Sequence, residues 1–159
     1  MRVEELMNKD VRACRADDSM NEAARVMWES DCGFVPVVAS DGSGRVVGVI
    51  TDRDVCMASY TRGVSLRELR VSEAMSANVR ACSPRDSLSS AEAEMGASRV
   101  RRLPVIDAAG QLLGVLSLAD IARGLASARA RGQKGITASE VGDLLAAVCQ
   151  RRQIAASGS

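Results

Sequence analysis

Two hydroxyl–carboxylate pairs with the same spacing are the residues of this chain best suited to bind a ligand. Thr51 and Asp54 form one pair, Ser117 and Asp120 the other, and a helical pattern follows each. A carboxylate at the start of a helix can accept hydrogen bonds from both hydroxyls of a ribose, and a hydroxyl three residues earlier can meet a phosphate or sugar oxygen. The helix amino terminus favours an anion beside them. The same spacing also describes simple N-capping, so both interpretations stay open, and both can hold at once.

Catalytic and metal chemistry finds little support in the residue types. The chain contains no histidine, which weakens serine or cysteine catalysis with an imidazole base and leaves a zinc site only scattered thiols and carboxylates. It also lacks a P-loop. The acids Asp52 and Asp54, or Asp17 and Asp18, are more simply caps and solvated turns than an acid/base pair. We therefore expect no enzyme, no catalytic residue and no metal site.

The cysteines favour a reducing compartment. They are odd in number, far apart and without a Cys-x-x-Cys pair, unlike a secreted disulfide framework, and comprise Cys14, Cys32, Cys56, Cys82 and Cys149. We interpret them mainly as small buried apolar residues. Cys32 lies just before the apolar strand that contains Pro36 and Val37, and a redox-sensing thiol is the alternative there.

Composition narrows the class of protein further. The 159 residues are 47% hydrophobic and only 2% aromatic, so small and branched apolar side chains must fill the interior. The 21 basic and 20 acidic residues nearly cancel, which predicts neither nucleic-acid nor membrane-surface binding. No apolar stretch approaches the roughly 20 residues of a membrane span. We expect a soluble, cytoplasmic protein.

An internal repeat organises the chain. The segment Val11 to Cys14 recurs 68 residues later as Val79 to Cys82, and the spacing holds through Pro36-Val37 and Pro104-Val105. It shortens to 66 residues at Gly48 and Gly114, because the first copy has the longer turn. Each copy predicts a strand, a helix, two strands and a second helix.

The elements of the first copy are a strand at 11–14, a helix after the capping box of Ser19 and Glu22, strands at 34–38 and 46–50, and a helix from 52 to about 59. In the second copy Ser87 is the cap, with Ser90 replacing the glutamate, and the strands are expected at 103–106 and 111–116. Such small halves must share one core, so the fold class is α+β with the halves packed sheet to sheet.

A C-terminal segment follows the repeat. Residues 132–154 predict a linker and an amphipathic helix, with a capping box at Thr137 and Glu140 and an apolar stripe of Val141, Leu144, Leu145 and Val148. This helix either covers the core of its own chain or contacts a second copy or partner. Residues 155–159 are expected to be disordered.

The chain resembles the CBS (cystathionine-β-synthase-type) domain family in these residues. The family's strongest signal is a strand that ends in glycine, two apolar residues, Thr or Ser, two further residues and Asp. One copy matches it with Gly48, Thr51 and Asp54, and the other with Gly114, Ser117 and Asp120. The resemblance covers about residues 1–130 and implies a stand-alone CBS pair, or Bateman module, with domains at 1–70 and 71–131.

The resemblance also implies clefts between the halves that bind AMP, ADP or ATP, or related compounds such as S-adenosylmethionine or NAD, with no cofactor required. One cleft would combine Thr51, Arg53 and Asp54 with Val79, Arg101, Arg102 and Pro104 of the other half. Its twin would combine Ser117 and Asp120 with Val11 and with Pro36, and the stretch from Asp31 to Pro36 has an acid and no base. We therefore expect a charged nucleotide to prefer the first cleft. The alternative for Arg99, Arg101 and Arg102 is solvated charge paired with Glu92 or Glu94.

Two functions remain open. The first is a regulatory sensor whose nucleotide occupancy changes its packing, which a regulated protein of unknown identity then reads. The second is a scaffold with vestigial clefts that forms a homodimer through the helices after the two motifs.

Overall fold

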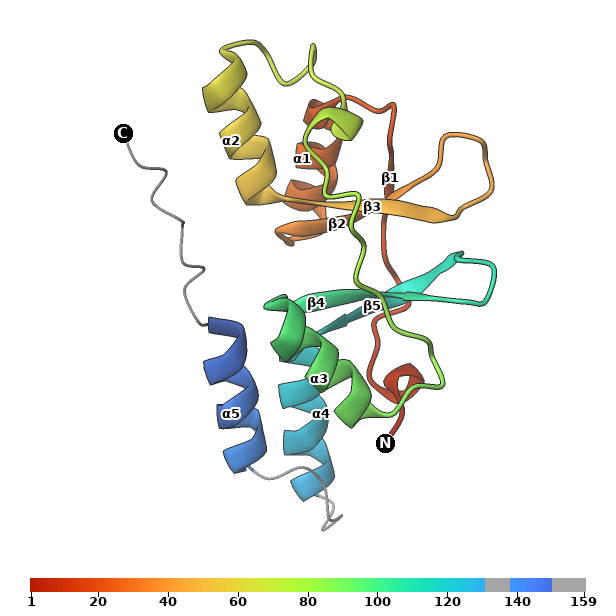
Figure 1. The fold of residues 1–159 in the computed structure, drawn as a ribbon, viewed down its shortest axis with the longest axis vertical. Helices are drawn as coiled ribbons and strands as arrows, with labels where there is room; N and C mark the ends of the chain where they lie inside the picture. Colours follow the sequence, from red (N-terminus) through yellow and green to blue (C-terminus); the bar gives the residue numbers. More distant parts are fainter. Residues whose placement is uncertain (131–137, 150–159) are drawn as a thin grey trace.

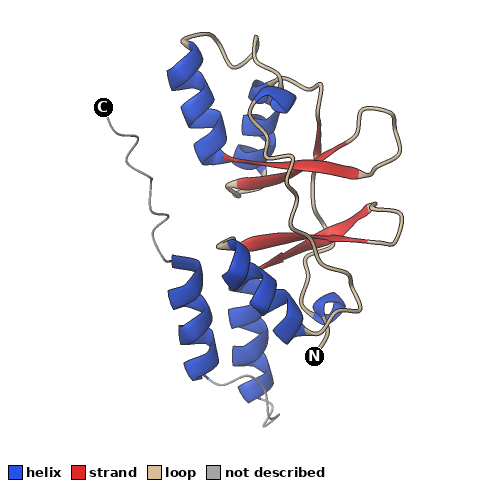
Figure 2. Cartoon of the chain, viewed as in Figure 1, coloured by secondary structure: helices blue, strands red, loops and turns tan. Residues whose placement is uncertain are grey.

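Two small sheets face each other at the centre of the molecule, and helices cover their outer sides (Figures 1 and 2). The computed structural model describes residues 1–130 and 138–149. The expected cap at Thr137 and the expected tail at 155–159 lie outside these residues. The repeat and the α+β class are confirmed, since both halves follow the predicted order. The elements are β1 (Cys14–Arg15), α1 (Met20–Glu29), β2 (Phe34–Val38), β3 (Val46–Thr51), α2 (Asp52–Arg62), α3 (Leu88–Ser98), β4 (Arg102–Ile106), β5 (Leu112–Ser117), α4 (Leu118–Ala130) and α5 (Ala138–Cys149), with 3-10 turns at Val3–Glu5 and Val71–Glu73.

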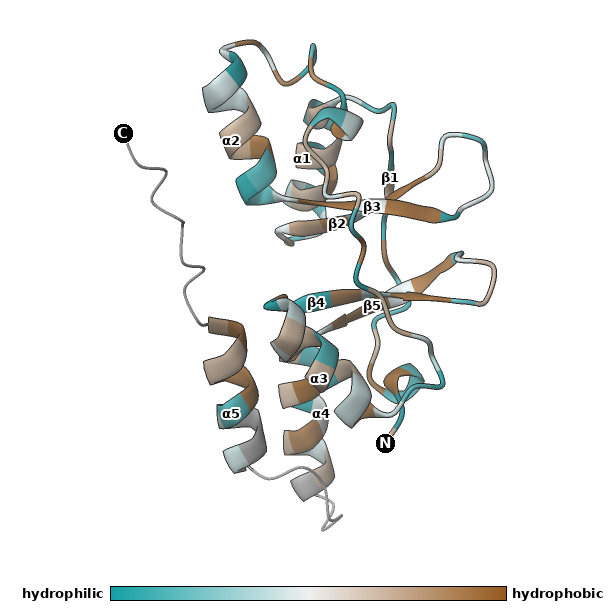
Figure 3. Cartoon of the chain, in the orientation of Figure 1, coloured by the Kyte–Doolittle hydropathy of each residue, from teal (hydrophilic) through white to brown (hydrophobic). Residues whose placement is uncertain are grey.

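The antiparallel strand pairs of the two sheets have the same register at equivalent residues. In the first half (β1 to α2), β2 pairs antiparallel with β3 and places Pro36 opposite Val49. In the second half (β4, β5 and their helices), β4 and β5 place Pro104 opposite Val115. Figure 3 shows apolar residues along these facing strands. The hairpin turns also meet, because the Val46 amide donates to the Gly110 carbonyl at 2.9 Å.

The first strand of each half is shorter than predicted. The expected strand at 11–14 forms only at Cys14–Arg15, parallel to β2, and the segment at 79–82 makes a single bridge between Cys82 and Val105. The residues just upstream pair with the opposite half instead: Asn8 bridges to Val115, and Ser76 bridges to Val49. Because each segment crosses between the halves, only its last residues run beside their own sheet.

These crossing segments exchange apolar residues between the halves. Val3 and Met7 pack in the core of the second half, whereas Val71 and Met75 pack in the core of the first. The expected domain division between residues 70 and 71 stays a prediction. The exchange explains why neither half holds a complete core of its own.

The exchange also explains the glycines of the two repeat motifs. A Cβ at Gly114 would lie 2.5 Å from the Asn8 carbonyl oxygen, and one at Gly48 would lie 2.6 Å from Met75 Sδ and 3.2 Å from the Ser76 carbonyl oxygen. Contacts this close leave no room for a side chain. The crossing segment can therefore pair with its strand only where that strand has a glycine.

The helix caps agree with the sequence in part. Ser19 and Ser87 each accept a hydrogen bond from the amide three residues on, as N-caps do. The predicted reciprocal bond of Glu22 is wrong, because the Glu22 carboxylate pairs with Arg25 one turn along the exposed face of α1. Two surface guanidinium bonds replace one bond to the backbone.

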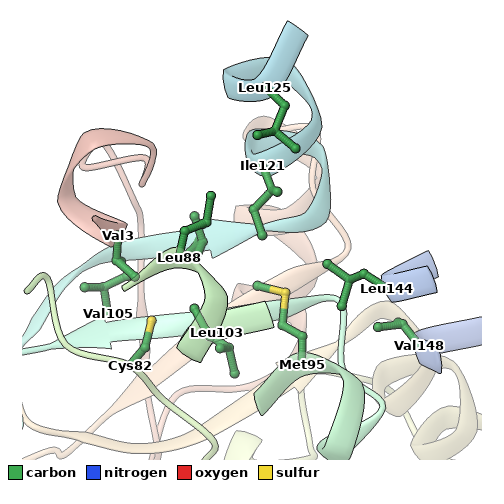
Figure 4. Packing of buried hydrophobic residues seen from close by; sticks show 12 residues of the cluster. Val3, Cys82, Leu88, Met95, Leu103, Val105, Ile121, Leu125, Leu144 and Val148 are labelled. Carbon is green, nitrogen blue, oxygen red and sulfur yellow. The ribbon is translucent and has the colours of Figure 1, made fainter. Parts of the chain in front are cut away.

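The C-terminal helix α5 covers the core of its own chain. Leu144 and Val148 are buried in the second-half cluster and point toward Met95 of α3 (Figure 4). A Cβ at Gly96 of α3 would lie 3.5 Å from the Ala147 Cβ, so the two helices are closely packed. The next residue, Leu145, is 46% exposed. No helix within 1–130 or 138–149 is long and apolar enough to cross a membrane.

Candidate functional site

Thr51 and Asp54 form a reciprocal capping box at the junction of β3 and α2. The Thr51 amide donates to Asp54 Oδ2 at 2.8 Å, and the Thr51 hydroxyl donates to the same oxygen at 2.7 Å. The Asp54 amide in turn donates to Thr51 Oγ1 at 3.3 Å. Both side chains are half-buried. The capping interpretation of this motif is therefore confirmed, and it fixes the orientation of the carboxylate.

Ser117 and Asp120 form the same box at the junction of β5 and α4. The Ser117 amide donates to Asp120 Oδ2 at 2.9 Å, and the Asp120 amide donates to Ser117 Oγ at 3.1 Å. The Ser117 hydroxyl also donates to Oδ2. The two motifs are thus equivalent in backbone geometry.

The second carboxylate oxygen distinguishes the two motifs. Asp120 Oδ1 accepts a hydrogen bond from Arg123, whose side chain is 73% exposed. Oδ1 of Asp54 accepts no hydrogen bond within the described part of the chain. Asp54 thus has one carboxylate oxygen that accepts no bond from these residues, whereas both carboxylate oxygens of Asp120 accept hydrogen bonds.

Arg102 reaches across the interface between the halves. It begins β4, opposite Ser117, and lines a hollow of about 530 Å³ together with residues of the first half. Asp52, in the first turn of α2, lines the same hollow close to Gly33, where a Cβ would lie 2.6 Å from Asp52 Oδ2. The lining does not include Thr51 or Asp54. Arg102 thus shares this hollow with Asp52 of α2, and its role toward a ligand stays a prediction.

The other arginines of this region do not line the hollow. The Arg101 guanidinium donates to Cys149 Sγ at 3.6 Å, at the end of α5. Arg99 ends α3 in the left-handed region, with φ 52°. Arg53 is exposed on α2. Glu94 pairs with Arg80 at 3.8 Å, rather than with one of the three arginines considered from the sequence.

The apolar residues expected to form cleft walls differ in exposure. Pro36 and Pro104 are buried within β2 and β4. The Pro104 carbonyl accepts a hydrogen bond from the Cys82 amide at 3.0 Å, so it belongs to its own sheet. Val11 and Val79 are half-buried in the crossing segments. Their role toward a ligand remains a prediction.

The cysteines divide into buried and accessible thiols. Burial raises the pKa of the Cys14 thiol to about 12, and the nearby Asp18 carboxylate adds to this effect. Burial raises the pKa of Cys82 to about 12 as well, with a contribution from Asp86. The prediction that all five are mainly buried is wrong for Cys56 and Cys149, which are exposed, and for Cys32, which is half-buried. Both exposed thiols lie on helices, Cys56 on α2 and Cys149 at the end of α5.

Sequence reasoning missed the hollow itself. It is lined by α1, the loop before β2, the first turn of α2 and Arg102, and it carries Trp28, Asp31 and Asp52. The only available signal was Trp28, the single tryptophan of the chain, at a position where the second copy has Gly96.

The comparisons with known proteins agree with this architecture. The CBS domain model matches residues 3–60 and 71–127. The chain is 32% identical over 120 residues to the CBS domain-containing protein YhcV of Bacillus subtilis, covering 76% of this chain and 82% of YhcV. It is also 30% identical over 121 residues, 76% of this chain, to the homoserine O-acetyltransferase of Methanohalobium evestigatum, but spans only 23% of that enzyme's length.

Solved structures show the same fold. The CBS domain pair of protein MJ0100 has a TM-score of 0.71 at 22% identity, covering 80% of this chain and 97% of that one. CBSX2 has a TM-score of 0.69 at 22% identity, with coverage of 80% and 98%. The repeat, the two capping boxes and the matched residues lead to one conclusion: this chain belongs to the CBS domain family and carries two such domains in tandem.

Proposed function

We propose that this protein is a non-catalytic regulatory module that binds an adenine nucleotide, such as AMP, ADP or ATP, in clefts between its two CBS domains. The observation that carries the proposal is the carboxylate of Asp54. It lies half-buried at a helix amino terminus, with one oxygen held by Thr51 and the other open to a donor. Adjacent ribose hydroxyls are donors of the required kind, and the helix terminus favours a phosphate nearby.

The solved relatives support an adenosine-containing ligand. The MJ0100 pair was crystallised with 5'-methylthioadenosine and S-adenosyl-L-methionine, and CBSX2 was crystallised with AMP. These ligands share the adenosine group and differ in charge. Adenosine recognition is therefore the common chemistry that we extend to this chain, and the charge of its ligand must follow from its own residues.

The charged groups favour a phosphate at the Thr51 and Asp54 motif. Arg53 lies exposed in the first turn of α2, and Arg102 of the other half lines the hollow beside that turn. At the twin motif Arg123 is already paired with Asp120. We propose that AMP, ADP or ATP binds beside Asp54, while the Asp120 cleft is empty or takes a less anionic adenosyl ligand.

A thermal-shift panel of AMP, ADP, ATP, NAD and S-adenosylmethionine tests the function. A ligand present at 100 times its Kd stabilises the fold by about 2.7 kcal/mol, which corresponds to a rise in Tm of about 5–10 °C for a chain of this size. We expect such a rise with at least one adenine nucleotide. Unchanged melting with all five compounds would exclude the sensor function.

A scaffold is the second candidate, and the exposed face of α2 favours it. Met57 is 45% exposed and Tyr60 is 81% exposed, three residues apart on one side of this helix. Such a stripe suits a homodimer through α2 and α4. A tight dimer in sedimentation experiments, combined with no response to any nucleotide, would favour the scaffold. A dimer that still binds nucleotide fits the sensor.

A further inference from the structure

The β2–β3 turn and the β4–β5 turn bond to each other as a short antiparallel pair. The Val46 amide donates to the Gly110 carbonyl at 2.9 Å, and the Leu112 amide donates to the Gly44 carbonyl at 3.3 Å. Each bond is the repeat equivalent of the other, since Val46 corresponds to Leu112 and Gly44 to Gly110. One reciprocal, pseudo-symmetric contact therefore joins the two halves at their hairpins, and we call these two bonds the hairpin latch.

Neighbouring residues of both turns support the hairpin latch. Arg45 and Gln111 form an isolated antiparallel bridge between the two bonds, and the Gln111 side chain donates to the Ser43 carbonyl at 3.2 Å. Gly44 and Gly110, which supply the two acceptor carbonyls, have φ angles of 70° and 79°. This is the left-handed region that favours glycine. The geometry of the latch thus depends on residue types that only these positions of the turns require.

Both hairpins also carry a bulge next to the latch. The pairing of the first hairpin shifts by one residue between Val37 and Val38, which leaves Val47 without an opposite residue. The second hairpin shifts in the same way between Val105 and Ile106. A bulge bends its strand and increases the local twist. Both hairpins therefore change direction at equivalent places, beside the residues that form the latch.

The opposite end of the facing strands has no such bond. There β3 ends at Thr51 and β5 ends at Ser117, and the helices α2 and α4 begin (Figure 1). The next amides, those of Asp52 and Leu118, each donate to a carbonyl of their own half. Among the residues that the structure describes, no hydrogen bond joins any of these four residues to the other half. Hydrogen bonds thus fasten the halves at the hairpin end and leave the helix end unfastened.

The crossing segments join the halves between these two ends. Asn8 exchanges two backbone hydrogen bonds with Val115, both at 2.9 Å, and Ser76 exchanges two with Val49, at 2.9 and 3.0 Å. From Asn8 and Ser76 the chain continues to the other sheet through a few residues that form neither helix nor strand. Such short connections can absorb a rotation of packed units through changes in their backbone dihedral angles. They therefore allow the helix end to open while the hairpin end stays joined.

We propose that the hairpin latch is the hinge of the CBS pair, about which the two halves rotate so that the ends of β3 and β5 approach or separate. A strand rises about 3.3 Å per residue, so Thr51 lies roughly 16 Å along β3 from Val46, and a rotation of about 10° moves it by about 3 Å. A displacement of this size is enough to make or break a hydrogen bond. The hinge does not depend on the proposed nucleotide function, but a nucleotide that contacts both halves would favour one orientation.

Distances between spin labels test the hinge in the whole protein. One pair of labels reports on the helix end, at Arg53 and Ala119, which are exposed and equivalent in the first turns of α2 and α4. The other pair reports on the hairpin end, at Ser43 and Ala109, which are exposed and equivalent in the two turns. Each pair is introduced as two cysteines. An excess of unlabelled protein ensures that only distances within one chain are measured.

The native thiols require a matched background. Serine replaces the exposed Cys56 and Cys149 and the half-buried Cys32. Cys14 and Cys82 stay in place, because they are buried. This background without introduced cysteines is the control for unspecific labelling.

The two label pairs should give different distance distributions in the absence of ligand. We expect the Arg53–Ala119 distribution to be broader than the Ser43–Ala109 distribution by about 3 Å, the displacement that a small rotation produces at the far end of a strand. Equal widths, or a broader distribution at the hairpin turns, would overturn the hinge. Saturating AMP should narrow the Arg53–Ala119 distribution only. Different widths without any response to AMP would support the hinge and contradict the nucleotide function proposed above.

Val46→Pro tests the hairpin latch itself. Proline has no amide hydrogen to donate to Gly110, and it is tolerated at the first residue of a strand. We expect this variant to broaden the Ser43–Ala109 distribution, whereas Val46→Ala, which keeps the amide, should leave it unchanged. Circular dichroism verifies that both variants are folded. A distribution as narrow in folded Val46→Pro as in wild type would overturn the proposal.

Discussion

Asp54 is held by Thr51 through only one of its two carboxylate oxygens. The amide and the hydroxyl of Thr51 both donate to Oδ2, at 2.8 and 2.7 Å, and Oδ1 accepts no bond within the described residues. In the twin motif Arg123 donates to the corresponding oxygen of Asp120. The repeat therefore builds two copies of one box, and a single surface arginine makes them different. The predictions below separate the structural role of these residues from the proposed binding role.

Removal of a capping carboxylate should destabilise the fold. We expect Asp54→Ala to lower the free energy of unfolding by about 1 kcal/mol, because the Thr51 amide loses its acceptor. Asp54→Asn should lower the free energy of unfolding by less, since the amide oxygen of asparagine can still accept this bond. Urea denaturation measures both values. Equal stability of wild type and Asp54→Ala would mean that the box contributes nothing to the fold.

Alanine at Gly114 should destabilise the protein more than alanine at Gly48. The added Cβ would meet the rigid Asn8 carbonyl oxygen at 2.5 Å in the first case, but the flexible Met75 side chain at 2.6 Å in the second. We expect Gly114→Ala to cost about 1–3 kcal/mol in unfolding experiments, the usual range for overpacking.

Gly142 provides the matched control for these glycines. It lies inside α5, and apart from its own helix and chain neighbours no atom of residues 1–130 or 138–149 lies within 4 Å of the position that its Cβ would take. Gly142→Ala should therefore stabilise the protein by up to about 1 kcal/mol through helix propensity. A destabilising effect at Gly142, or a neutral one at Gly114, would contradict the packing described for these positions.

Truncation of Leu144 should show that α5 belongs to the core of its own chain. Leu144 is buried among second-half residues, whereas its neighbour Leu145 is 46% exposed. We expect Leu144→Ala to lower the free energy of unfolding by about 2 kcal/mol or more, and Leu145→Ala to change it by less than about 0.5 kcal/mol. Similar small effects at both positions would argue that α5 is not part of the folding unit.

The thiols should react with a disulfide reagent in two classes. At pH 8 a thiol with a pKa of about 12 is thiolate in only about one molecule in ten thousand, so Cys14 and Cys82 should stay unlabelled in the folded protein. The exposed Cys56 and Cys149 should label quickly. Denaturant should release the remaining thiols, and peptide mass analysis identifies each site. Labelling of Cys14 before unfolding would contradict its burial.

The repeat predicted the local elements well because their signals are local. The spacing of apolar residues predicted the buried sides of α1 and α3. The spacing of Thr51 and Asp54 predicted a capping box that the structure contains. The capping box predicted at Ser19 lacks the bond from Glu22, because the Glu22 carboxylate pairs with Arg25 instead. The spacing of Ser19 and Glu22 gives no information on such a competing partner.

Long-range contacts were not predictable from the sequence. Val3 and Val71 have ordinary apolar neighbours along the chain, and nothing in their local pattern shows that each packs in the opposite half. Arg101 fits a phosphate contact by its type, but α5 places Cys149 beside its guanidinium. Cys149 lies 48 residues from Arg101, and the buried core neighbours of Val3 begin only at Cys82.

Titration calorimetry with AMP tests the central claim most directly. The proteins are wild type, Asp54→Asn and the matched variant Asp120→Asn, each of which retains an acceptor for its capping bond. We predict that Asp54→Asn weakens AMP binding at least about tenfold, as loss of a charged acceptor does, and that Asp120→Asn changes it less than about threefold. Unchanged affinity in Asp54→Asn, or a larger loss in Asp120→Asn, would contradict the assignment of the nucleotide to the Asp54 side.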